Sequence, residues 1–384
     1  MRILVVTHEV SRTGAPRVAL LVTHALVEVG HGVHVVSRRP GPLLEEFEAA
    51  APTTLEPLLR VRRRLWLTNG LRWLALLVDE LAAAATILRR RPDVVYINST
   101  SAAAYLRPAL WLRRAVILHA HESEELMRAF LAPQAAVALA HRASLIACSP
   151  SVHTALSAIA GVSPADIALV PSVPDADAVE RLAGLEPDHD YAAADLVVGC
   201  CGSVEPRKGA DLWLAVADRV LNATPEASVR FVWVGELVDP PPGAAAAHDV
   251  FLGPSANPYA HMRRFDVATL PSRDDPFPLV VLEAMLAGTP VVAFDVGGVA
   301  HQLGGTGVVV PAGDVEAFAE AVCELLADPD RRRMLSIRAR ERALTEFSAE
   351  GFADQVRSVV AGISGQGPQR QRVGPRLTPG PGSH

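Results

Sequence analysis

Two carboxylates, Asp275 and Glu283, lie in one motif with seven residues between them, within ATLPSRDDPFPLVVLEAMLAGTPVVAFDVGG at 268–298. Carboxylate oxygens bind phosphate poorly, but they accept hydrogen bonds well from sugar hydroxyls. Either acid taken alone is more often a solvated surface residue. Both lie near the expected start of a helix, where unpaired N–H groups and the helix dipole attract an anion. An anion site flanked by two acids suits a nucleotide sugar.

Pro278 marks the expected start of that helix, because its fixed φ suits the first turn and its missing N–H is not needed there. The helix is predicted over 279–287 and ends at Gly288, beyond which Pro290 prevents its continuation. The candidate anion-binding residues at the helix start are Phe277, Pro278 and Leu279.

A second candidate anion site is the loop GSVEPRKG at 202–209, between an apolar run and a helix expected over 210–222. Gly202 and Gly209 permit close backbone approach, while Arg207 and Lys208 offer positive charge to a diphosphate. The alternative is a surface turn with two solvated bases, and for Arg207 and Lys208 alone that alternative is the better one.

Gly14 lies in the loop of a first βαβ unit, between a strand at 2–7 and a helix at 16–29. The G-x-G-x-x-G pattern is absent, so a dinucleotide fingerprint is not supported.

Two histidines, His119 and His121, follow the apolar strand expected at 115–118, and Asn98 follows the strand at 94–97. Polar residues at the carboxyl ends of strands line the crevice in which open α/β sheets bind ligands. The histidines are two residues apart and face the same side of an extended chain. A lone histidine in such a place is more often structural than functional.

The 384 residues are too many for one ordinary core and enough for two. Half of them are apolar and few are aromatic, which suits α/β layers. The Pro- and Asp-rich stretch 171–195 is predicted to link two domains. The expected parts are an N-terminal domain at 1–170, a C-terminal domain at 196–346, a helix at 347–363 and a disordered tail at 364–384.

Composition excludes several classes of protein. The net charge of −6 argues against a nucleic-acid binder. No secretion signal is convincing, since His8 and Glu9 interrupt the first apolar run at once. The four cysteines lack metal spacing and are expected to be reduced, which predicts a cytoplasmic protein; they are Cys148, Cys200, Cys201 and Cys323.

Residues 57–91 are basic and amphipathic and contain Trp66 and Trp73. Such a stretch could lie on an anionic membrane surface, which would put the protein at the inner membrane face. The alternative, slightly favoured, is a surface helix pair with its arginines in water. The apolar segment at 74–88 carries Asp79 and Glu80 and is too short for a membrane span.

The stretch PSRDDPFPLVVLEAMLAGTPVVA resembles the acid-x7-acid signature of retaining glycosyltransferases of the family 4 type, which have the GT-B fold. The loop at 202–209 is similar to the G-x5-K-G phosphate loop of that family, and SRTGAPRVALL to its Gly-containing first loop. Two positions depart from the family: Asp275 stands where Glu is usual, and Ser203 where Arg is frequent.

The resemblance implies two Rossmann-like domains facing across a cleft, with a C-terminal helix that crosses back to the first. It also implies transfer of a sugar from a nucleoside-diphosphate sugar to a hydroxyl acceptor, with retention and without a metal or other cofactor. Asp175-Ala176-Asp177 matches the D-x-D pattern that holds a divalent metal ion in other glycosyltransferases. Here a chance match is the better explanation, because the residues lie in the expected linker. The resemblance places Asp275 and His121 at the transferred sugar and Glu283 at the ribose. Gly14 faces the donor. The diphosphate lies against the loop residues Gly202, Arg207 and Lys208 and against the helix start at Phe277, Pro278 and Leu279.

The acceptor could be a glycan, a lipid-linked sugar or a natural product. Because of the departures at Ser203 and Asp275, two alternatives stay open. One is a non-catalytic GT-B protein that binds a nucleotide sugar. The other is a GT-B epimerase or phosphorylase.

Overall fold

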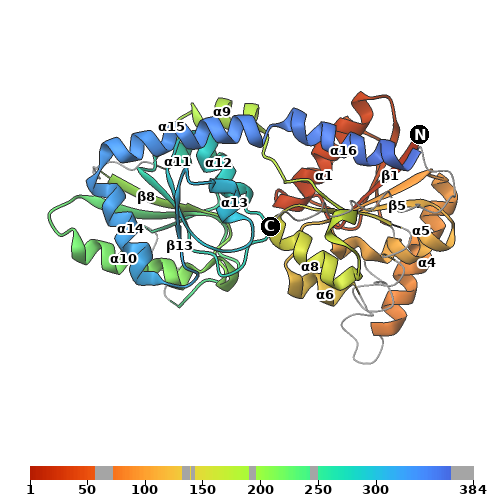
Figure 1. The fold of residues 1–384 in the computed structure, drawn as a ribbon, viewed down its shortest axis with the longest axis horizontal. Coiled ribbons are helices and arrows are strands. Elements are labelled where there is room, and N and C mark those ends of the chain that lie inside the picture. Colours follow the sequence, from red (N-terminus) through yellow and green to blue (C-terminus); the bar gives the residue numbers. More distant parts are fainter. Residues whose placement is uncertain (57–71, 132–138, 140–142, 190–195, 243–249, 365–384) are drawn as a thin grey trace, which may run out of the picture.

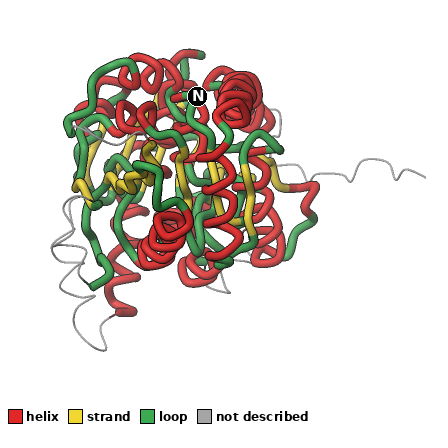
Figure 2. The backbone as a smooth tube through the Cα atoms, turned by 90° about the vertical axis from the view of Figure 1, so that its left-hand side faces the viewer, coloured by secondary structure: helices red, strands yellow, loops and turns green. Residues whose placement is uncertain are grey.

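Two parallel β-sheets, one from each half of the chain, lie side by side in the computed structural model (Figure 1). The structure describes residues 1–56, 72–131, 139, 143–189, 196–242 and 250–364. Helices cover the sheets, and Figure 2 shows strands as a layer with helices above and below. Strands covered on both faces need continuous apolar runs, such as RILVVT and LVVGCC. The predicted pair of Rossmann-like units is confirmed.

The N-terminal sheet has the order β3-β2-β1-β4-β5-β6-β7, and its paired strands are parallel. From β1 the chain adds strands first on one side (β2, β3) and then on the other (β4 to β7), so β1 and β4 flank a switch point. Open α/β sheets bind ligands at the carboxyl ends of the strands at such a point. The strands are β1 (Arg2–Thr7), β2 (Gly32–Ser37), β3 (Thr53–Leu55), β4 (Val94–Asn98), β5 (Ala115–Ala120), β6 (Ala143–Ala147) and β7 (Ile167–Leu169). The described helices are α1 (Gly14–Glu28), α2 (Leu44–Ala50), α4 (Arg72–Arg90), α5 (Leu106–Trp111), α6 (Glu124–Phe130) and α8 (Pro150–Ala160), with 3-10 turns at Thr100–Tyr105 and Pro164–Asp166.

The C-terminal sheet has the order β10-β9-β8-β11-β12-β13, again with parallel pairs, and its switch point lies between β8 and β11. The strands are β8 (Leu196–Cys201), β9 (Val229–Val234), β10 (Phe251–Gly253), β11 (Val267–Leu270), β12 (Val291–Phe294) and β13 (Val308–Val310). The described helices are α9 (Ala176–Ala183), α10 (Ala210–Ala223), α11 (Pro258–Arg264), α12 (Leu279–Ala287), α13 (Val299–Leu303), α14 (Val315–Ala327) and α15 (Pro329–Glu346), with a 3-10 turn at Pro206–Lys208.

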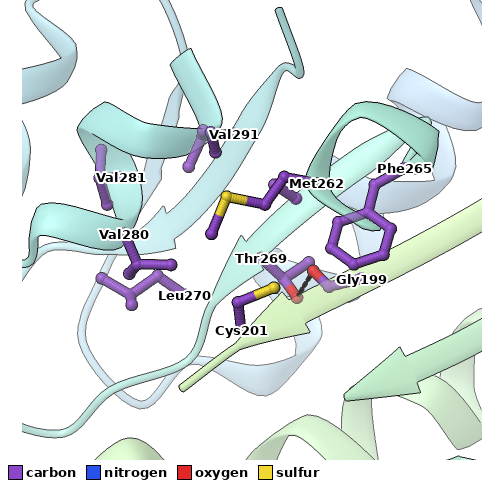
Figure 3. Close-up of a pocket in the computed structure, with 11 residues that line it drawn as sticks. Gly199, Cys201, Met262, Phe265, Thr269, Leu270, Val280, Val281 and Val291 are labelled. Atoms are coloured by element: carbon purple, nitrogen blue, oxygen red, sulfur yellow. Dashed lines mark hydrogen bonds between the residues drawn. The ribbon is translucent and has the colours of Figure 1, made fainter. Parts of the chain in front are cut away.

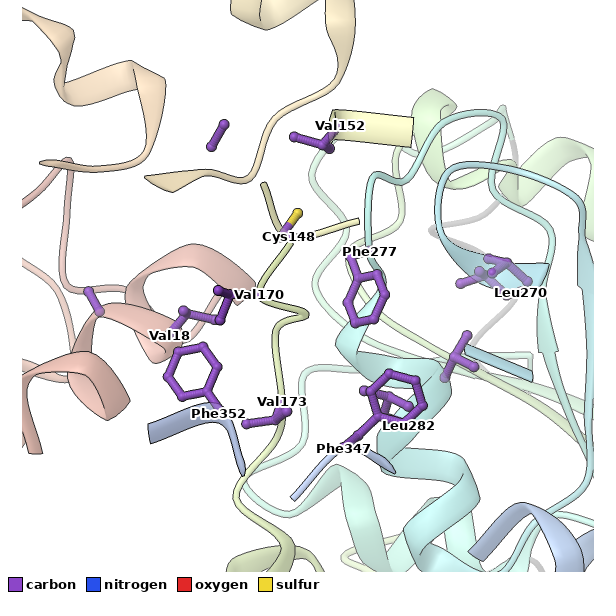
Figure 4. Close-up of a cluster of buried hydrophobic side chains, with 14 of the residues drawn as sticks. Val18, Cys148, Val152, Val170, Val173, Leu270, Phe277, Leu282, Phe347 and Phe352 are labelled. Atoms are coloured by element: carbon purple, nitrogen blue, oxygen red, sulfur yellow. The ribbon is translucent and has the colours of Figure 1, made fainter. Parts of the chain in front are cut away.

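The chain crosses between the two halves twice, and apolar residues are buried at both crossings. Val170 and Val173 lie on the first crossing, after β7, and Phe347 and Phe352 flank the second. Figure 4 shows these side chains between apolar residues of the two halves, and all of them belong to one continuous buried cluster. The two sheets are therefore held together by apolar packing at the crossings.

The last described helix, α16 (Ala349–Ser364), lies against α1 of the N-terminal half (Figure 1). Its Arg357 donates from Nη2 to Oε2 of Glu28 at 2.5 Å and from Nε to the Ala25 carbonyl at 3.2 Å. The predicted return of the C-terminal helix to the first half is thus confirmed. The tail that was expected to be disordered lies, from residue 365 on, outside the described residues.

The expected linker at 171–195 contains α9, which packs against α11 and α12 of the C-terminal half. Oδ1 of Asp175 accepts the N–H of Ala178 at 3.0 Å and so caps α9. The D-x-D residues therefore have a structural role at a helix start. Residues 190–195 lie outside the described part of the chain, and the domain limits 1–170 and 196–346 stay predictions.

Candidate functional site

Two loops at the C-terminal switch point, 202–209 after β8 and 271–278 after β11, are in direct contact. Gly209 has φ +73°, and a Cβ there would lie 2.1 Å from the Pro271 carbonyl oxygen, so this close approach requires glycine. The Arg273 N–H donates to the Arg207 carbonyl at 2.9 Å, and Nη1 of Arg207 donates to the Asp274 carbonyl at 3.0 Å. The basic loop and the acidic motif thus form one site.

Lys208 and Asp275 are the charged centre of this site. Nζ of Lys208 lies 2.5 Å from Oδ2 of Asp275, and the two side chains are only 16% and 9% exposed. Nη1 of Arg207 lies 3.9 Å from the same oxygen, while its Nη2 pairs with Glu205 at 2.8 Å. The carboxylate offsets the lysine charge, so no buried charge is left unpaired.

Ser203, the position at which the family frequently has Arg, donates from Oγ to Oε1 of Glu205 at 3.0 Å. The same Oε1 accepts from Arg207. Glu205 therefore holds the guanidinium of Arg207 near Asp275. Arg207 supplies a positive charge to this loop that Ser203 cannot supply.

Helix α12 begins at Leu279, with Pro278 as the N-cap residue, and ends before Gly288, whose φ is +80°. No side chain caps its N-terminus and no acid lies in its first turn, so its positive end is free to attract an anion. Phe277 is buried, with its ring centroid 6.0 Å from that of Phe347. The Phe277 side chain belongs to the core, which leaves only its backbone for a ligand.

The N-terminal end of α1 faces that of α12 across the boundary between the two halves. A Cβ on Gly14 would lie 3.9 Å from Cδ1 of Leu279. Two predicted donor-binding residues from opposite halves of the chain are therefore brought together. The φ of Gly14 is not positive, so its backbone conformation does not itself require glycine. The positive ends of two helix dipoles meet at this place.

Glu283 is buried in α12 and forms an ion pair, through Oε1, with Nη1 of Arg17 on α1. The Tyr259 hydroxyl accepts from Nη2 of Arg17 at 2.6 Å and donates to the same Oε1 at 3.3 Å. The nearby carboxylate raises the pKa of Arg17, and burial raises the pKa of Tyr259, so both keep their protons. The sequence marks neither residue as part of a site; the only signal is that Arg17 lies three residues after Gly14.

His121 lies at the N-terminal switch point with both ring nitrogens near partners. Nδ2 of Asn98 donates to the Ala15 carbonyl at 2.8 Å, which turns its Oδ1 toward Nε2 of His121 at 3.3 Å. Nε2 therefore carries the proton, and Nδ1 is left to accept from the Ser172 hydroxyl at 3.4 Å. Burial lowers the pKa of His121 to about 4, so the ring is neutral near pH 7.

Glu122, next to His121, is fully engaged with the β4–α5 connection. Its carboxylate accepts from the Ser99 hydroxyl, from the Thr100 hydroxyl at 2.8 Å and from the Thr100 N–H at 3.0 Å. Burial opposes its ionisation, but His121 and these donors outweigh burial and lower its pKa. His119 is fully buried, and its Nδ1 is 2.9 Å from the Tyr96 hydroxyl. His119 thus belongs to the core and is not a site residue.

A small cavity lies behind the site, between β8, β11, α11 and α12 (Figure 3). It has a volume of about 10 Å³, which is room for one water at most. Its lining is mainly apolar, with Val280, Met262 and Phe265 among the side chains. This cavity is therefore part of the packing beneath the site and not a place for a nucleotide.

Within the described residues, no group of three or more His, Cys, Asp or Glu side chains could hold a metal ion. Within the same ranges, no helix is both long and apolar enough to cross a membrane. Trp66 and four arginines of the expected membrane stretch lie at 57–71, outside the described residues; these arginines are Arg60, Arg62, Arg63 and Arg64. Of that stretch the structure describes α4, which ends with Arg89 and Arg90.

The family model "Glycosyltransferase Family 4" matches residues 12–177, and the model "Glycosyl transferases group 1" matches residues 195–328. The chain is 31% identical over 218 residues to the D-inositol 3-phosphate glycosyltransferase of Rhodococcus opacus (strain B4), covering 50% of this chain and 47% of that protein. It is 42% identical over 106 residues to the alpha-maltose-1-phosphate synthase of Mycolicibacterium smegmatis, covering 26% and 27%. The chain spans about half or less of the length of these relatives.

Among solved structures, the chain resembles HepE of Anabaena in complex with UDP and glucose, with a TM-score of 0.74 and 21% identity over 94% of this chain and 99% of that one. It also resembles a glycosyltransferase of Rickettsia africae, with a TM-score of 0.74 and 15% identity over 94% and 98%. These likenesses support the fold. The two family models, which match residues 12–177 and 195–328, show that the chain belongs to the group 1/family 4 glycosyltransferases, which have the GT-B fold.

Proposed function

We propose that this protein transfers a sugar from a nucleoside-diphosphate sugar to a hydroxyl acceptor, with retention at the anomeric carbon. The observation that carries the proposal is the Lys208–Asp275 pair, 2.5 Å apart, next to the free N-terminus of α12. A cation, a helix dipole and a carboxylate meet there, which is the combination that a sugar diphosphate requires.

In this reaction the bond between the anomeric carbon and the diphosphate oxygen breaks, and its electron pair stays on the diphosphate. The acceptor oxygen bonds to the anomeric carbon on the same face and passes its proton to the departing diphosphate. Lys208, Arg207 and the start of α12 stabilise the negative charge that grows on the leaving group, so catalysis is electrostatic. No protein nucleophile and no metal ion is needed.

Donor binding divides between the two halves. Asp275 holds hydroxyls of the transferred sugar, and Lys208 leaves this carboxylate to bind the diphosphate. Glu283 holds the ribose, and Gly14 lets the α1 loop approach the donor. His121 contributes through its neutral Nε2–H, for which a sugar hydroxyl competes with Asn98.

A UDP-sugar is the first donor to test, because HepE, which shares the fold, is described with UDP and glucose. Several relatives are named D-inositol 3-phosphate glycosyltransferases, which makes a polar hydroxyl compound a reasonable first acceptor.

The test has two steps. A thermal-shift screen of nucleotide sugars identifies the donor, because a ligand that binds only the native state raises the melting temperature. Release of nucleoside diphosphate from that donor is then followed with and without acceptors. A retaining transferase forms a glycoside with the donor's anomeric configuration. Binding without turnover would indicate the non-catalytic alternative. Conversion of the nucleotide sugar to its epimer in the absence of acceptor would indicate an epimerase, and turnover that requires inorganic phosphate would indicate a phosphorylase.

We also infer weak attachment of the N-terminal half to anionic membranes through α4, which lies at the outer edge of that half (Figure 1). One side of α4 is buried at Ala75, Ala83 and Ile87. The opposite side carries an exposed apolar stripe at helical spacing, formed by Leu77, Leu81 and Leu88. The helix ends with two exposed arginines, Arg89 and Arg90, which suits an interfacial helix.

A further inference from the structure

Glu283 has two carboxylate oxygens, and its partners in the protein use only one of them. Arg17 and Tyr259 both bind Oε1. Among the described residues, none forms a hydrogen bond with Oε2 of Glu283. Each oxygen of a carboxylate accepts hydrogen bonds separately. Oε2 is therefore available to a ligand hydroxyl while Arg17 and Tyr259 hold Oε1.

The two partners reach Glu283 from opposite halves of the chain. Arg17 comes from the N-terminal end of α1, and Tyr259 from the first turn of α11. Tyr259 is 8% exposed, and its hydroxyl lies between the guanidinium and the carboxylate. The contact of Gly14 with Leu279 brings the start of α1 next to the start of α12, the helix that carries Glu283, about one turn away. This arrangement exists only when the two halves lie as they do in this structure.

We propose that Arg17 and Tyr259 are positioning residues that hold Oε1 of Glu283 and so direct Oε2 toward the ribose hydroxyls of the donor. Since Arg17 belongs to the other half, the proposed ribose site is built from residues of both halves of the chain. This inference rests on the proposed function, because it assigns the ribose to Glu283.

A different role for Arg17 follows if the ribose must displace it. Arg17 would then block the site, and its removal would tighten nucleotide binding. Geometry favours positioning, because the Arg17–Tyr259–Glu283 contacts leave Oε2 unoccupied. The two roles predict opposite changes in affinity, so one measurement separates them.

The experiment measures the dissociation constants of UDP and 2′,3′-dideoxy-UDP by calorimetry for the full chain and its variants. Arg17→Ala is expected to weaken UDP binding about tenfold to a hundredfold, as is typical for loss of a charged hydrogen bond. It leaves the affinity for the dideoxy nucleotide unchanged, because that probe has no ribose hydroxyls. Arg17→Lys restores part of the loss, and Tyr259→Phe shows a smaller loss of the same kind. In turnover, Arg17→Ala raises the donor KM and keeps kcat, since the ribose is remote from the bond that breaks.

The matched control is Arg12→Ala, which removes an exposed arginine from the loop that precedes α1. Arg17→Ala in a Glu283→Gln background should add no further loss, because the two residues act through one carboxylate. Unchanged UDP affinity in Arg17→Ala, an equal loss with the dideoxy probe, or tighter binding each overturns the proposal. Melting curves identify variants that fail to fold, and Tyr259→Phe then carries the test. If the wild-type chain binds neither UDP nor ADP nor GDP, the proposed function itself fails, and this inference fails with it.

Discussion

The two switch points of this molecule have the same parallel-sheet topology, but they differ in the charge of the side chains that they present. At the C-terminal one, Lys208 and Arg207 each place a full charge within 4 Å of the Asp275 carboxylate. At the N-terminal one, His121 is neutral and is held by Asn98 and Ser172 through ordinary hydrogen bonds. The C-terminal side offers full charges to a ligand, whereas on the N-terminal side the charge of Glu122 is taken up by Ser99 and Thr100 and the side chain offered is the neutral ring of His121.

The difference matches the division of work in glycosyl transfer. Negative charge develops on the leaving diphosphate, and fixed charges stabilise it best where they are aimed in advance. A sugar and its acceptor are neutral, so a neutral donor such as the His121 ring can orient their hydroxyls through ordinary hydrogen bonds. The charged half is therefore expected to control turnover, and the neutral half to control orientation. Three predictions test this contrast and a fourth tests the proposed membrane face, in order of decreasing effect.

Lys208→Ala should lower kcat by about 10²–10³, because it removes one electrostatic stabiliser of the leaving group. Arg207 can replace part of its charge, so the double change of both residues to alanine should lower kcat further. The measurement is kcat with the identified donor, together with a melting curve. Arg219→Ala, at an exposed ion pair with Glu316, is the control. Near-normal kcat in the double variant would remove the diphosphate role from this loop.

Glu283→Gln should weaken donor binding by about 1.5–3 kcal/mol, because a neutral amide replaces a charged acceptor of hydroxyl hydrogen bonds. Calorimetry with the donor measures the loss, and Glu324→Gln, at an exposed ion pair with Arg331, serves as the matched control. Unchanged donor affinity would count decisively against a ribose role for this acid.

The neutral half should lose stability when the pH falls from about 6.5 to about 4. The pKa of His121 is lowered from 6.5 to about 4 by burial, so the unfolded chain binds more protons than the folded chain in this window. The free energy of unfolding therefore decreases with decreasing pH, by up to about 1.4 kcal/mol per pH unit for one such group. His119, also buried, adds to the same slope.

Urea unfolding at several pH values between 4.5 and 7 measures this slope. His121→Gln should reduce it, while His24→Gln, an exposed position on α1, should not. An identical slope in His121→Gln and the wild type would show that His121 titrates with the same pKa in the folded and unfolded chain, and the contrast between the halves would then be weaker.

The smallest effect is expected at the proposed membrane face. The protein should co-sediment with anionic vesicles at low salt and less at high salt. Arg89→Ala should weaken this association by about 1 kcal/mol, which is typical for one basic residue near such a surface. Leu81→Glu, within the exposed stripe, should weaken it too without changing the melting temperature. If the wild-type protein stays in the supernatant at low salt, α4 is an ordinary surface helix.

Much of the fold could be predicted from the sequence because its signals are local. Apolar runs without alternation marked the long strands, and Pro278 and Gly288 marked the ends of α12 through their backbone preferences. The candidate residues Lys208 and Asp275 were also found this way, since each lies in a short motif with fixed spacing. Even α9 had such a signal, because Asp175 is a typical N-cap residue, although the stretch was interpreted only as a linker.

Only the tertiary structure could decide which side chains meet across the boundary between the halves. Arg17 and Glu283 are far apart in the chain, and their pairing depends on how α1 and α12 face each other. The same is true of Asn98, Ser172 and His121, which come from three separate segments. Propensity and spacing act over a few residues, whereas these contacts depend on sheet order and on the buried crossings. The sequence alone therefore determined the fold and the charged motif, while packing decided the partners that hold the site in place.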